Sequence, residues 1–305
     1  MISSSLSTSF ARALQAAQDA AGAQQHPTHT LYVVATPIGN LADISLRALH
    51  VLGLVDTLAC EDTRHTRQML QAYGLERPAQ QLLAVHQHNE TEAAQMVLER
   101  LAQGERVAYV SDAGTPAISD PGARLVRAVR AAGHRVLPLP GASSITTLLS
   151  AGGMTGDGFV FSGFLPSKAA ERQQAVQAIA QEGRAVLLLE APHRMAALAE
   201  ALAVLGSREV TVGRELTKQF EQIVTLAARD LPVWMAERPE HQRGEFVLLV
   251  HEQPVMAAKA EGERILRCLL PELPLKTAVK LAAEISGEPR NGLYEQALAL
   301  KAQGD

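Results

Sequence analysis

Charged residues follow three short apolar runs directly, at positions where parallel strands would end. The three clusters lie at residues 61–64, 190–194 and 214–218. Taking a charge out of water is costly unless the charge is paired or used. Internal ion pairing would explain some of these charges. The recurrence of one arrangement nevertheless favours a functional site, with carboxylates able to accept a proton and cations able to hold an anionic group.

Three loops of small residues share a similar composition. They read TPIGN (36–40), SDAGTPAISDPG (111–122) and PGASS (140–144), and each stands between an apolar run and a helical pattern. In a parallel sheet such loops meet at one edge, where ligands bind, and small side chains let a ligand approach the backbone. None is a Walker A or G-x-G-x-x-G motif. We therefore expect a neutral or cationic adenosine-type ligand, held by backbone groups and Asp112, rather than a nucleotide held by its phosphates.

Other catalytic patterns receive little support. Ser143 and Ser144 stand outside any G-x-S-x-G motif and have no identifiable base. His86 and His88 lack an H-E-x-x-H pattern or an acidic cluster, so we interpret them as core or solvated histidines and predict no metal site. Cys60 and Cys268 are far apart in sequence, which argues against a disulfide framework and for a reducing cytoplasm.

A regular alternation of apolar runs and helical patterns begins at residue 31. It predicts strands over 31–35, 57–60, 82–85, 107–110 and 135–139, with intervening helices. The helix after the fourth strand should begin with Asp120 as N-cap and Pro121 as first helical residue, and end at Gly133. Beyond a glycine- and serine-rich patch at 150–158, further strands are expected over 159–163, 185–189, 209–212 and 246–250. The pattern predicts an α/β fold with mostly parallel sheets, in two domains over 30–150 and 151–252.

The two ends of the chain differ from these domains. Residues 1–29 are rich in Ser, Ala and Gln, so we predict a disordered extension that could hold a few helical turns around 10–21. Residues 253–305 predict a small helical region. The net charge of −4 excludes a protein coated in positive charge for gripping nucleic acid. No run approaches the roughly 20 apolar residues that a membrane span needs.

Several of these segments together carry a family resemblance. They are LYVVATPIGNLADISLRAL (31–49), CEDTR (60–64), VSDAGTPAISDPG (110–122), PGASS (140–144), FSGFLP (161–166), EAPHRM (190–195), RELTKQFE (214–221) and GEFVLLV (244–250). The chain resembles the tetrapyrrole methylase superfamily of S-adenosylmethionine-dependent methyltransferases. TPIGNL, EDTR and RELTK are typical of its branch that methylates a cytidine 2′-hydroxyl of small-subunit ribosomal RNA, and not of its precorrin and diphthine methylases. Ser144, where the family usually has alanine, and the 150–153 segment are small departures.

The resemblance implies two α/β domains with S-adenosylmethionine in the cleft between them, and a homodimer. It implies that the cofactor is bound by Pro37, Gly39, Asn40, Asp112, Ala113, Gly114, Thr115 and Ser143. The hypothesis is attack of a ribose 2′-hydroxyl on the methyl group, with no metal required. The candidates for general base, unranked, are Glu61, Asp62, Glu190 and Glu215. Those for holding the RNA backbone are Arg64, Arg194, Arg214 and Lys218.

Two other functions stay open from the sequence. One is a methylase of a small tetrapyrrole or of a protein side chain, against which the EDTR and RELTK clusters count. The other is a non-catalytic factor that assists ribosome assembly. The helical tail could contact RNA through Lys276, Lys280 and Arg290, or it could serve packing or dimerisation.

Overall fold

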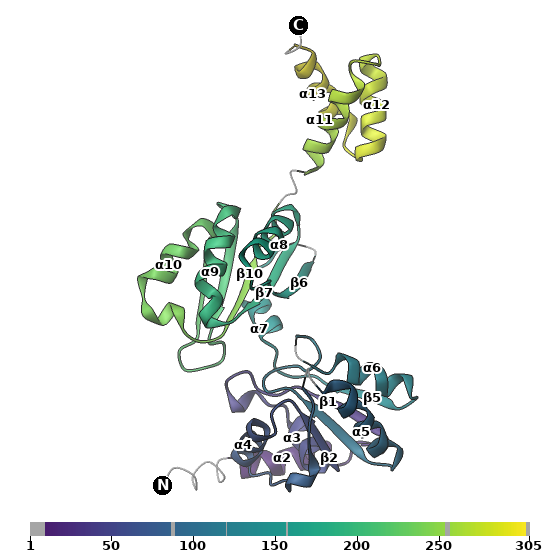
Figure 1. Cartoon of the computed structure of the whole chain (residues 1–305), viewed down its shortest axis with the longest axis vertical. Coiled ribbons are helices and arrows are strands. Elements are labelled where there is room, and N and C mark those ends of the chain that lie inside the picture. Colours follow the sequence, from purple (N-terminus) through teal and green to yellow (C-terminus); the bar gives the residue numbers. More distant parts are fainter. Residues whose placement is uncertain (1–9, 87–88, 120, 157, 254–256, 303–305) are drawn as a thin grey trace.

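The structure is a computed structural model that describes residues 10–86, 89–119, 121–156, 158–253 and 257–302. This part of the chain forms two five-stranded sheets with their helices, followed by a helical C-terminal bundle. The three bodies are stacked along the long axis of the molecule, and the first two face each other across the ends of their strands (Figure 1).

The first sheet is entirely parallel, with the order β3-β2-β4-β1-β5. Its strands are β1 (Thr30–Val34), β2 (Thr57–Cys60), β3 (Leu82–Ala84), β4 (Arg106–Val110) and β5 (Arg135–Leu139). Parallel pairing puts all the carboxyl ends at one edge. The loops that begin at residues 36, 61, 111 and 140 therefore leave the sheet on the same side, as the sequence predicted.

Helices cover both faces of this sheet because alternate strand residues point in opposite directions. Tyr32 and Val34 pack with α3 (Leu46–Leu54) and α4 (Thr63–Tyr73). Leu31 and Val33 pack with α5 (Glu90–Ala102) and α6 (Ala123–Ala131). Burial on both faces explains why the strands are continuous apolar runs rather than alternating ones.

The N-terminal segment differs from the expected disordered extension over its described residues, which start at 10. Helix α2 (Ala11–Ala21) packs against α3. Ala17 and Ala21 are buried on one helical face, where small side chains allow close approach, and the Phe10 ring meets Tyr73 edge-on with centroids 5.0 Å apart. Residues 1–9 lie outside the described residues.

The start of α6 also differs from the prediction. Asp120, the expected N-cap, lies outside the described residues, and the helix begins at Ala123 rather than Pro121. Gly122 precedes it with φ 121°, and Tyr109 fills the space that a side chain there would need. The carboxylate of Glu90 accepts hydrogen bonds from the backbone N–H groups of Gly122 (2.9 Å) and Arg124 (3.0 Å). A residue of the preceding helix therefore caps α6.

The second sheet is mixed, with the order β6-β7-β10-β8-β9. Its strands are β6 (Phe159–Phe164), β7 (Ala185–Glu190), β8 (Glu209–Arg214), β9 (Gln222–Ala227) and β10 (Phe246–Val250). Only β6 and β7 pair in parallel, whereas β10 is antiparallel to β7 and β8, and β9 to β8. The α/β fold is confirmed, but the prediction of a mostly parallel second sheet is wrong. The sequence analysis missed β9, which forms a hairpin with β8.

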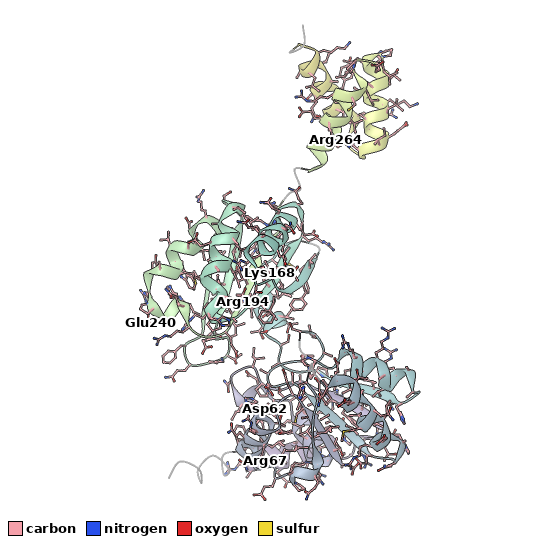
Figure 2. All side chains as sticks on the ribbon, in the orientation of Figure 1. Asp62, Arg67, Lys168, Arg194, Glu240 and Arg264 are labelled. Atoms are coloured by element: carbon pink, nitrogen blue, oxygen red, sulfur yellow. The ribbon has the colours of Figure 1, made fainter. Side chains whose placement is uncertain are left out.

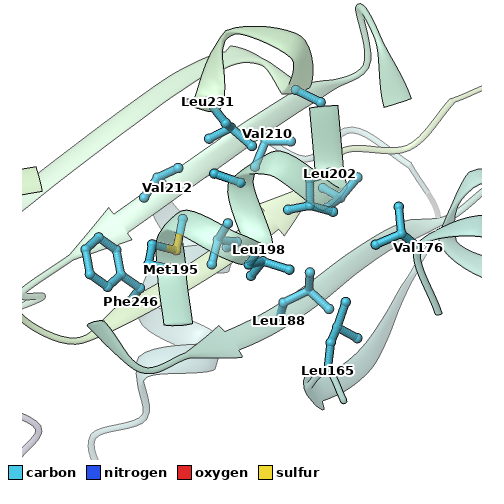
Figure 3. Packing of buried hydrophobic residues seen from close by; sticks show 14 of the residues in the cluster. Leu165, Val176, Leu188, Met195, Leu198, Leu202, Val210, Val212, Leu231 and Phe246 are labelled. Carbon is cyan, nitrogen blue, oxygen red and sulfur yellow. The ribbon is translucent and has the colours of Figure 1, made fainter. Parts of the chain in front are cut away.

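The core of the second domain lies between this sheet and the helices α8 (Ala169–Gln181), α9 (Pro192–Leu202) and α10 (Leu231–Glu237) (Figure 3). On the other face, Leu148 of α7 (Ser144–Ala151) packs against Leu187 and Leu249. Ile38, from the first domain, joins the same cluster. Packing therefore places α7 with the second sheet, whereas the predicted limit between residues 150 and 151 falls at the last residue of this helix.

The C-terminal region is helical, as predicted. Helices α11 (Ala257–Leu269), α12 (Leu275–Ser286) and α13 (Arg290–Ala302) surround a small core of Ile265, Leu266, Val279, Ala282, Leu293 and Ala297. Short 3-10 turns occur elsewhere at 41–43, 79–81, 203–205, 228–230 and 239–242. None of the helices in the described ranges is both long and apolar enough to cross a membrane.

Candidate functional site

Two of the small-residue loops are joined at the edge of the first sheet. Thr36 and Gly114 exchange backbone hydrogen bonds of 2.9 and 3.0 Å, and the Thr36 hydroxyl donates to the carbonyl of Ser111 (3.1 Å). Gly114 has φ 82°, a conformation that favours glycine. The loops after β1 and β4 therefore form one continuous ledge.

The third loop closes against this ledge. The hydroxyl of Thr115 donates to the carbonyl of Ala142 (3.0 Å). A side chain at Gly141 would place its Cβ only 2.8 Å from the Cβ of Ala35, so the close approach requires glycine. The three loops that the sequence singled out therefore converge, and the glycines serve close packing of backbone on backbone.

A cavity of about 550 Å³ opens beside the ledge, and both domains line it. The first domain contributes Pro37, Ile38, Gly39, Leu41, His65, Gln68, Met69, Ala72, Asp112 and Ala113, and the second contributes Lys218 and Glu245. A smaller cavity of about 130 Å³ also has Ala113 in its wall, with Gly114, Thr115, Ile118, Ser119, Ser143, Ser144, Ile145, Phe164 and Leu189.

Of the predicted cofactor-binding residues, Pro37, Gly39, Asp112 and Ala113 line the larger cavity. Gly114, Thr115 and Ser143 line the smaller one. Asn40 lies in neither lining; it is exposed and accepts a hydrogen bond from the N–H of Ala42 (3.1 Å) as a helix cap.

The loop between β8 and β9 reaches from the second domain onto the first. Leu216 packs in the same cluster as Ile38, and a Cβ built on Gly39 would lie 2.4 Å from Cγ of Lys218. The Lys218 ammonium donates to Glu215 (2.9 Å) and forms an ion pair with Glu245 (3.1 Å). A cation paired with two carboxylates thus stands at the wall of the larger cavity.

Glu215 serves this loop as a structural acceptor. Its Oε1 also accepts the backbone N–H of Glu245 (2.9 Å). Burial would raise the pKa of Glu215, but the hydrogen bonds from Lys218 and Glu245 and the positive charges of Lys218 and Arg214 outweigh burial, so the pKa is lowered. The burial cost at Lys218 is likewise outweighed, and its pKa is raised.

Asp62 caps α4. Its carboxylate accepts from the N–H groups of Arg64 (2.7 Å) and His65, and pairs with the Arg64 guanidinium at 3.0 Å. The hydrogen bonds from Arg64 lower the pKa of Asp62 to about 2, which makes it a poor base near neutral pH. Its own N–H donates to Asp112 (3.2 Å), so the cap also positions a cavity residue. Glu61 is half-buried beside it.

Glu190 and Arg194 form an ion pair in which the carboxylate is buried and the guanidinium partly exposed, and neither residue is in a cavity lining. The Glu190 side chain is fully buried, its Oε1 accepts the N–H of Ala191 (2.9 Å), and it lies 3.1 Å from Nε of Arg194. Burial is the main reason why the pKa of Glu190 is raised. Arg194 also donates to the carbonyl of Leu165. Figure 2 shows Asp62 and Arg194 on the facing sides of the two domains.

Arg214, expected to hold RNA, is buried. Its guanidinium donates to the carbonyls of Arg243 (2.8 Å) and Phe220 (3.2 Å). Of the four predicted RNA contacts, Lys218 lines the larger cavity, whereas Arg64 is exposed outside its lining. The structure therefore gives Arg194 and Arg214 roles in holding backbone segments.

Sequence reasoning missed several cavity residues. His65, Gln68, Met69 and Ala72 recur at helical spacing along α4, directly after the cluster at 61–64, so a search for one helical face could have found them. Glu245 was not predicted because it precedes a strand instead of following one. It reaches the cavity because β10 runs antiparallel to β7 and β8, so the start of β10 lies beside the ends of those strands. In the ranges that the structure describes, no three His, Cys, Asp or Glu side chains gather as a metal site.

Comparisons with known proteins agree over most of the chain. Residues 30–232 match the family model described as Tetrapyrrole (Corrin/Porphyrin) Methylases, and residues 256–301 match that of the RsmI C-terminal HTH domain. The chain is 49% identical to the ribosomal RNA small subunit methyltransferase I of Pseudomonas aeruginosa over 278 residues, which are 88% of this chain and 96% of the relative. It is 47% identical to the protein of that name from Escherichia coli O157:H7, over 88% of this chain and 94% of the relative.

Solved structures share the fold at low identity. A diphthine synthase superposes with a TM-score of 0.56 at 15% identity, over 73% of this chain and 90% of its own. A cobalt precorrin-4 methyltransferase gives 0.54 at 17% identity, over 72% and 94%. A uroporphyrin-III C-methyltransferase from Thermus thermophilus, complexed with S-adenosyl homocysteine, gives 0.50 at 16% identity, over 72% and 96%.

Proposed function

Because the chain belongs to the tetrapyrrole methylase family, we propose that it transfers a methyl group from S-adenosylmethionine to the ribose 2′-hydroxyl of a cytidine in small-subunit ribosomal RNA. The observation that carries this function is the similarity to proteins named ribosomal RNA small subunit methyltransferase I, over nearly their full length. The choice of a cytidine 2′-hydroxyl rests on the resemblance that TPIGNL, EDTR and RELTK carry.

The residues around the two cavities fit the methyl donor. The ledge exposes backbone at small residues, and the Asp112 carboxylate suits a sulfonium cation or ribose hydroxyls. S-adenosylmethionine supplies an activated methyl group. The protein's own contribution is to align the hydroxyl with that group, and positioning can lower a barrier by roughly 7–11 kcal/mol at best.

The 2′-hydroxyl must lose its proton, and a positioned base typically adds about 10²–10⁴-fold to the rate. The candidates stay Glu61, Asp62, Glu190 and Glu215, and Asp112 joins them because it lines the larger cavity. Substitutions Glu61→Ala, Glu215→Ala and Asp112→Asn test three of these five candidates. Replacing the general base should lower kcat by about 10²–10⁴-fold while S-adenosylmethionine still binds. A variant with wild-type turnover would show that the replaced residue is not the base.

RNA would be held by the cations that remain available. Lys218 lines the larger cavity, the Arg64 side chain is 88% exposed, and Lys276, Lys280 and Arg290 are exposed on the C-terminal bundle. Charge reversal of Lys276 and Lys280 together should raise KM for the RNA substrate and leave kcat unchanged. The homodimer implied by the resemblance and the cytoplasmic location expected from the two cysteines belong to the same proposal, and light scattering in solution tests the homodimer.

Transfer of labelled methyl groups tests this function directly. Purified protein is incubated with methyl-labelled S-adenosylmethionine and small ribosomal subunits from a strain deleted for the gene, with free ribosomal RNA in parallel. Label in the RNA supports the proposal, and a preference for the particle supports recognition by shape. Donor binding without label in either substrate would favour a small-molecule or protein methylase, or an assembly factor.

A further inference from the structure

Phe220 is the most exposed of the large hydrophobic side chains in the part of the chain that the structure describes. It is 68% exposed, compared with 52% for Phe164 and 41% for Phe159. It stands two residues after Lys218, on the loop that joins β8 to β9 and reaches the first domain at Gly39. Exposing an aromatic ring to water has a hydrophobic cost, which a partner bound to the ring would remove.

The backbone that carries Phe220 is held by several hydrogen bonds. Its carbonyl accepts from Arg214 (3.2 Å), and the N–H of Glu221 donates to the carbonyl of Lys218 (3.1 Å). The Glu221 carboxylate in turn accepts the N–H of Thr217 (2.6 Å). The loop backbone is therefore fixed by hydrogen bonds, and the exposed Phe220 ring is held at a defined position.

The same loop holds two residues other than glycine in the left-handed region. Glu215 has φ 51° and Thr217 has φ 66°. Such conformations are costly, persist only when the surroundings enforce them, and cluster at functional sites. Here they let the chain turn tightly, with Leu216 directed into the contact between the domains and Lys218 at the cavity.

An exposed aromatic ring beside a cation is the combination with which proteins hold unpaired nucleic acid. The base stacks on the ring while the cation meets the phosphate, and stacking tolerates any base. An enzyme that draws one nucleotide into a cavity must unstack it from its neighbours, and a protein side chain can replace the lost stacking.

We propose that Phe220 is a positioning residue for the RNA substrate, on which an unpaired base next to the methylated nucleotide stacks. The inference rests on the proposed function, because it takes RNA as the substrate. Lys218 and Phe220 together bind the RNA strand where it enters the larger cavity. The Lys218 ammonium contacts a phosphate, and the Phe220 ring stacks on a base.

The test compares Phe220→Ala with Phe220→Trp in the full-length protein, using small ribosomal subunits as substrate. Phe220→Ala should raise KM for the particle by roughly 5- to 150-fold, the range of one lost base stack. The KM for S-adenosylmethionine and the melting temperature should stay as in the wild type. Phe220→Trp should restore the wild-type KM. Phe159→Ala is the matched control, since Phe159 is exposed at the opposite end of the sheet, and it should change nothing.

Fluorescence gives a second measurement that does not depend on turnover. The chain has one tryptophan, Trp234, which is buried and stacked on His241 with ring centroids 4.0 Å apart. The added indole of Phe220→Trp should therefore supply a new signal that is quenched when RNA binds and its base stacks.

Two outcomes would overturn this inference while the proposed function stands. One is wild-type KM in Phe220→Ala, with no quenching in Phe220→Trp. The other is a homodimer that dissociates on Phe220→Ala, since the ring would then be covered by a second copy. Failure of the wild-type protein to methylate any RNA would instead overturn the proposed function itself.

Discussion

Lys218 is a positively charged side chain in the lining of the larger cavity, and two carboxylates pair with it. It is 28% exposed, paired with Glu215 and Glu245, and its pKa is raised, so it stays charged near neutral pH. Two carboxylates close to one ammonium would leave little positive charge for a phosphate. Glu245, however, is 72% exposed, and that pair is screened by water. RNA can therefore compete with Glu245 for the cation.

Replacing Lys218 by methionine tests this role through salt dependence. A cation that contacts one phosphate contributes about one unit to the slope of log affinity against log salt. We expect Lys218→Met to lower that slope by about one for the RNA substrate. Lys168→Met is the control, because Lys168 is 79% exposed, paired with Glu171 and in neither cavity lining. An unchanged slope in Lys218→Met would contradict the contact.

Glu190 gives a prediction on pH. Burial raises its pKa, so the folded protein binds this proton more tightly than the unfolded chain does. The stability that this adds is fully present below the ordinary glutamate pKa of about 4.3 and is lost as pH rises through the raised value. The unfolding free energy of the wild type, relative to Glu190→Gln, should therefore fall as pH rises above about 4.3 in denaturant titrations.

Glu182 supplies the opposite case in the same domain. The hydrogen bonds from Arg184 lower its pKa to about 2, so its contribution is present above about pH 4.3 and is lost as pH falls toward 2. Relative to Glu182→Gln, the wild type should lose stability on acidification. Equal pH trends for the two substitutions would contradict the role assigned to burial at Glu190.

At the scale of elements, the N-terminus of α6 depends on a neighbouring helix. Glu90 is buried and supplies the acceptor for two N–H groups that would otherwise lack one. Glu90→Ala should lower the unfolding free energy by about 1–3 kcal/mol, the cost of leaving buried donors unsatisfied. Glu92→Ala, at an exposed position of the same helix, should change it by less than about 0.5 kcal/mol. Equal losses of unfolding free energy for Glu90→Ala and Glu92→Ala in denaturant titrations would contradict the capping role of Glu90.

The sequence was informative where structure is local. The runs around residues 57, 107, 135 and 246 became strands, because buried strands flanked by turn residues leave a clear pattern. It was less informative where a contact is distant: Glu90 caps a helix 32 residues away. β9 is partly exposed, and Gln222 and Thr225 interrupt its apolar residues, so no continuous run marked it. The direction of β10 depends on which strands it joins, and a single segment does not encode that.

In the candidate site, too, local features were predictable from the sequence and long-range contacts were not. The three loops were predictable because each is a strand–loop–helix unit with its own small residues. The structural roles of Arg214 and Glu190 were not, because the sequence does not show whether a charged residue after a strand faces a cavity or, as these two do, hydrogen-bonds to backbone groups. His65 and Met69 could be grouped from their helical spacing on α4, but the sequence does not show which side of that helix faces the cavity.

At the scale of the molecule, the site depends on how the loop of the second domain rests on the first. A Cβ on Gly39 would lie 2.4 Å from Cγ of Lys218 and 3.0 Å from Oγ1 of Thr217, so Gly39→Ala must shift the Lys218 side chain at the cavity wall. A misplacement of about 1 Å can cost roughly 10²-fold in rate. We expect kcat/KM to fall about 10- to 100-fold with the melting temperature nearly unchanged.

Gly158→Ala is the matched control for this substitution. No heavy atom lies within 4 Å of the Cβ that it would add, and it should have wild-type kinetics. If Gly39→Ala kept full activity, the contact between the two loops would have no part in forming the site.

The most direct measurement of the central claim is the chemical position of the transferred methyl group. RNA labelled by the protein in small subunits is hydrolysed with alkali, which cleaves next to every free 2′-hydroxyl. The account predicts label in alkali-resistant dinucleotides whose 5′ nucleoside is cytidine, because a 2′-O-methyl group blocks cleavage at that position. Label released as mononucleotides would place the methyl group on a base and contradict the account.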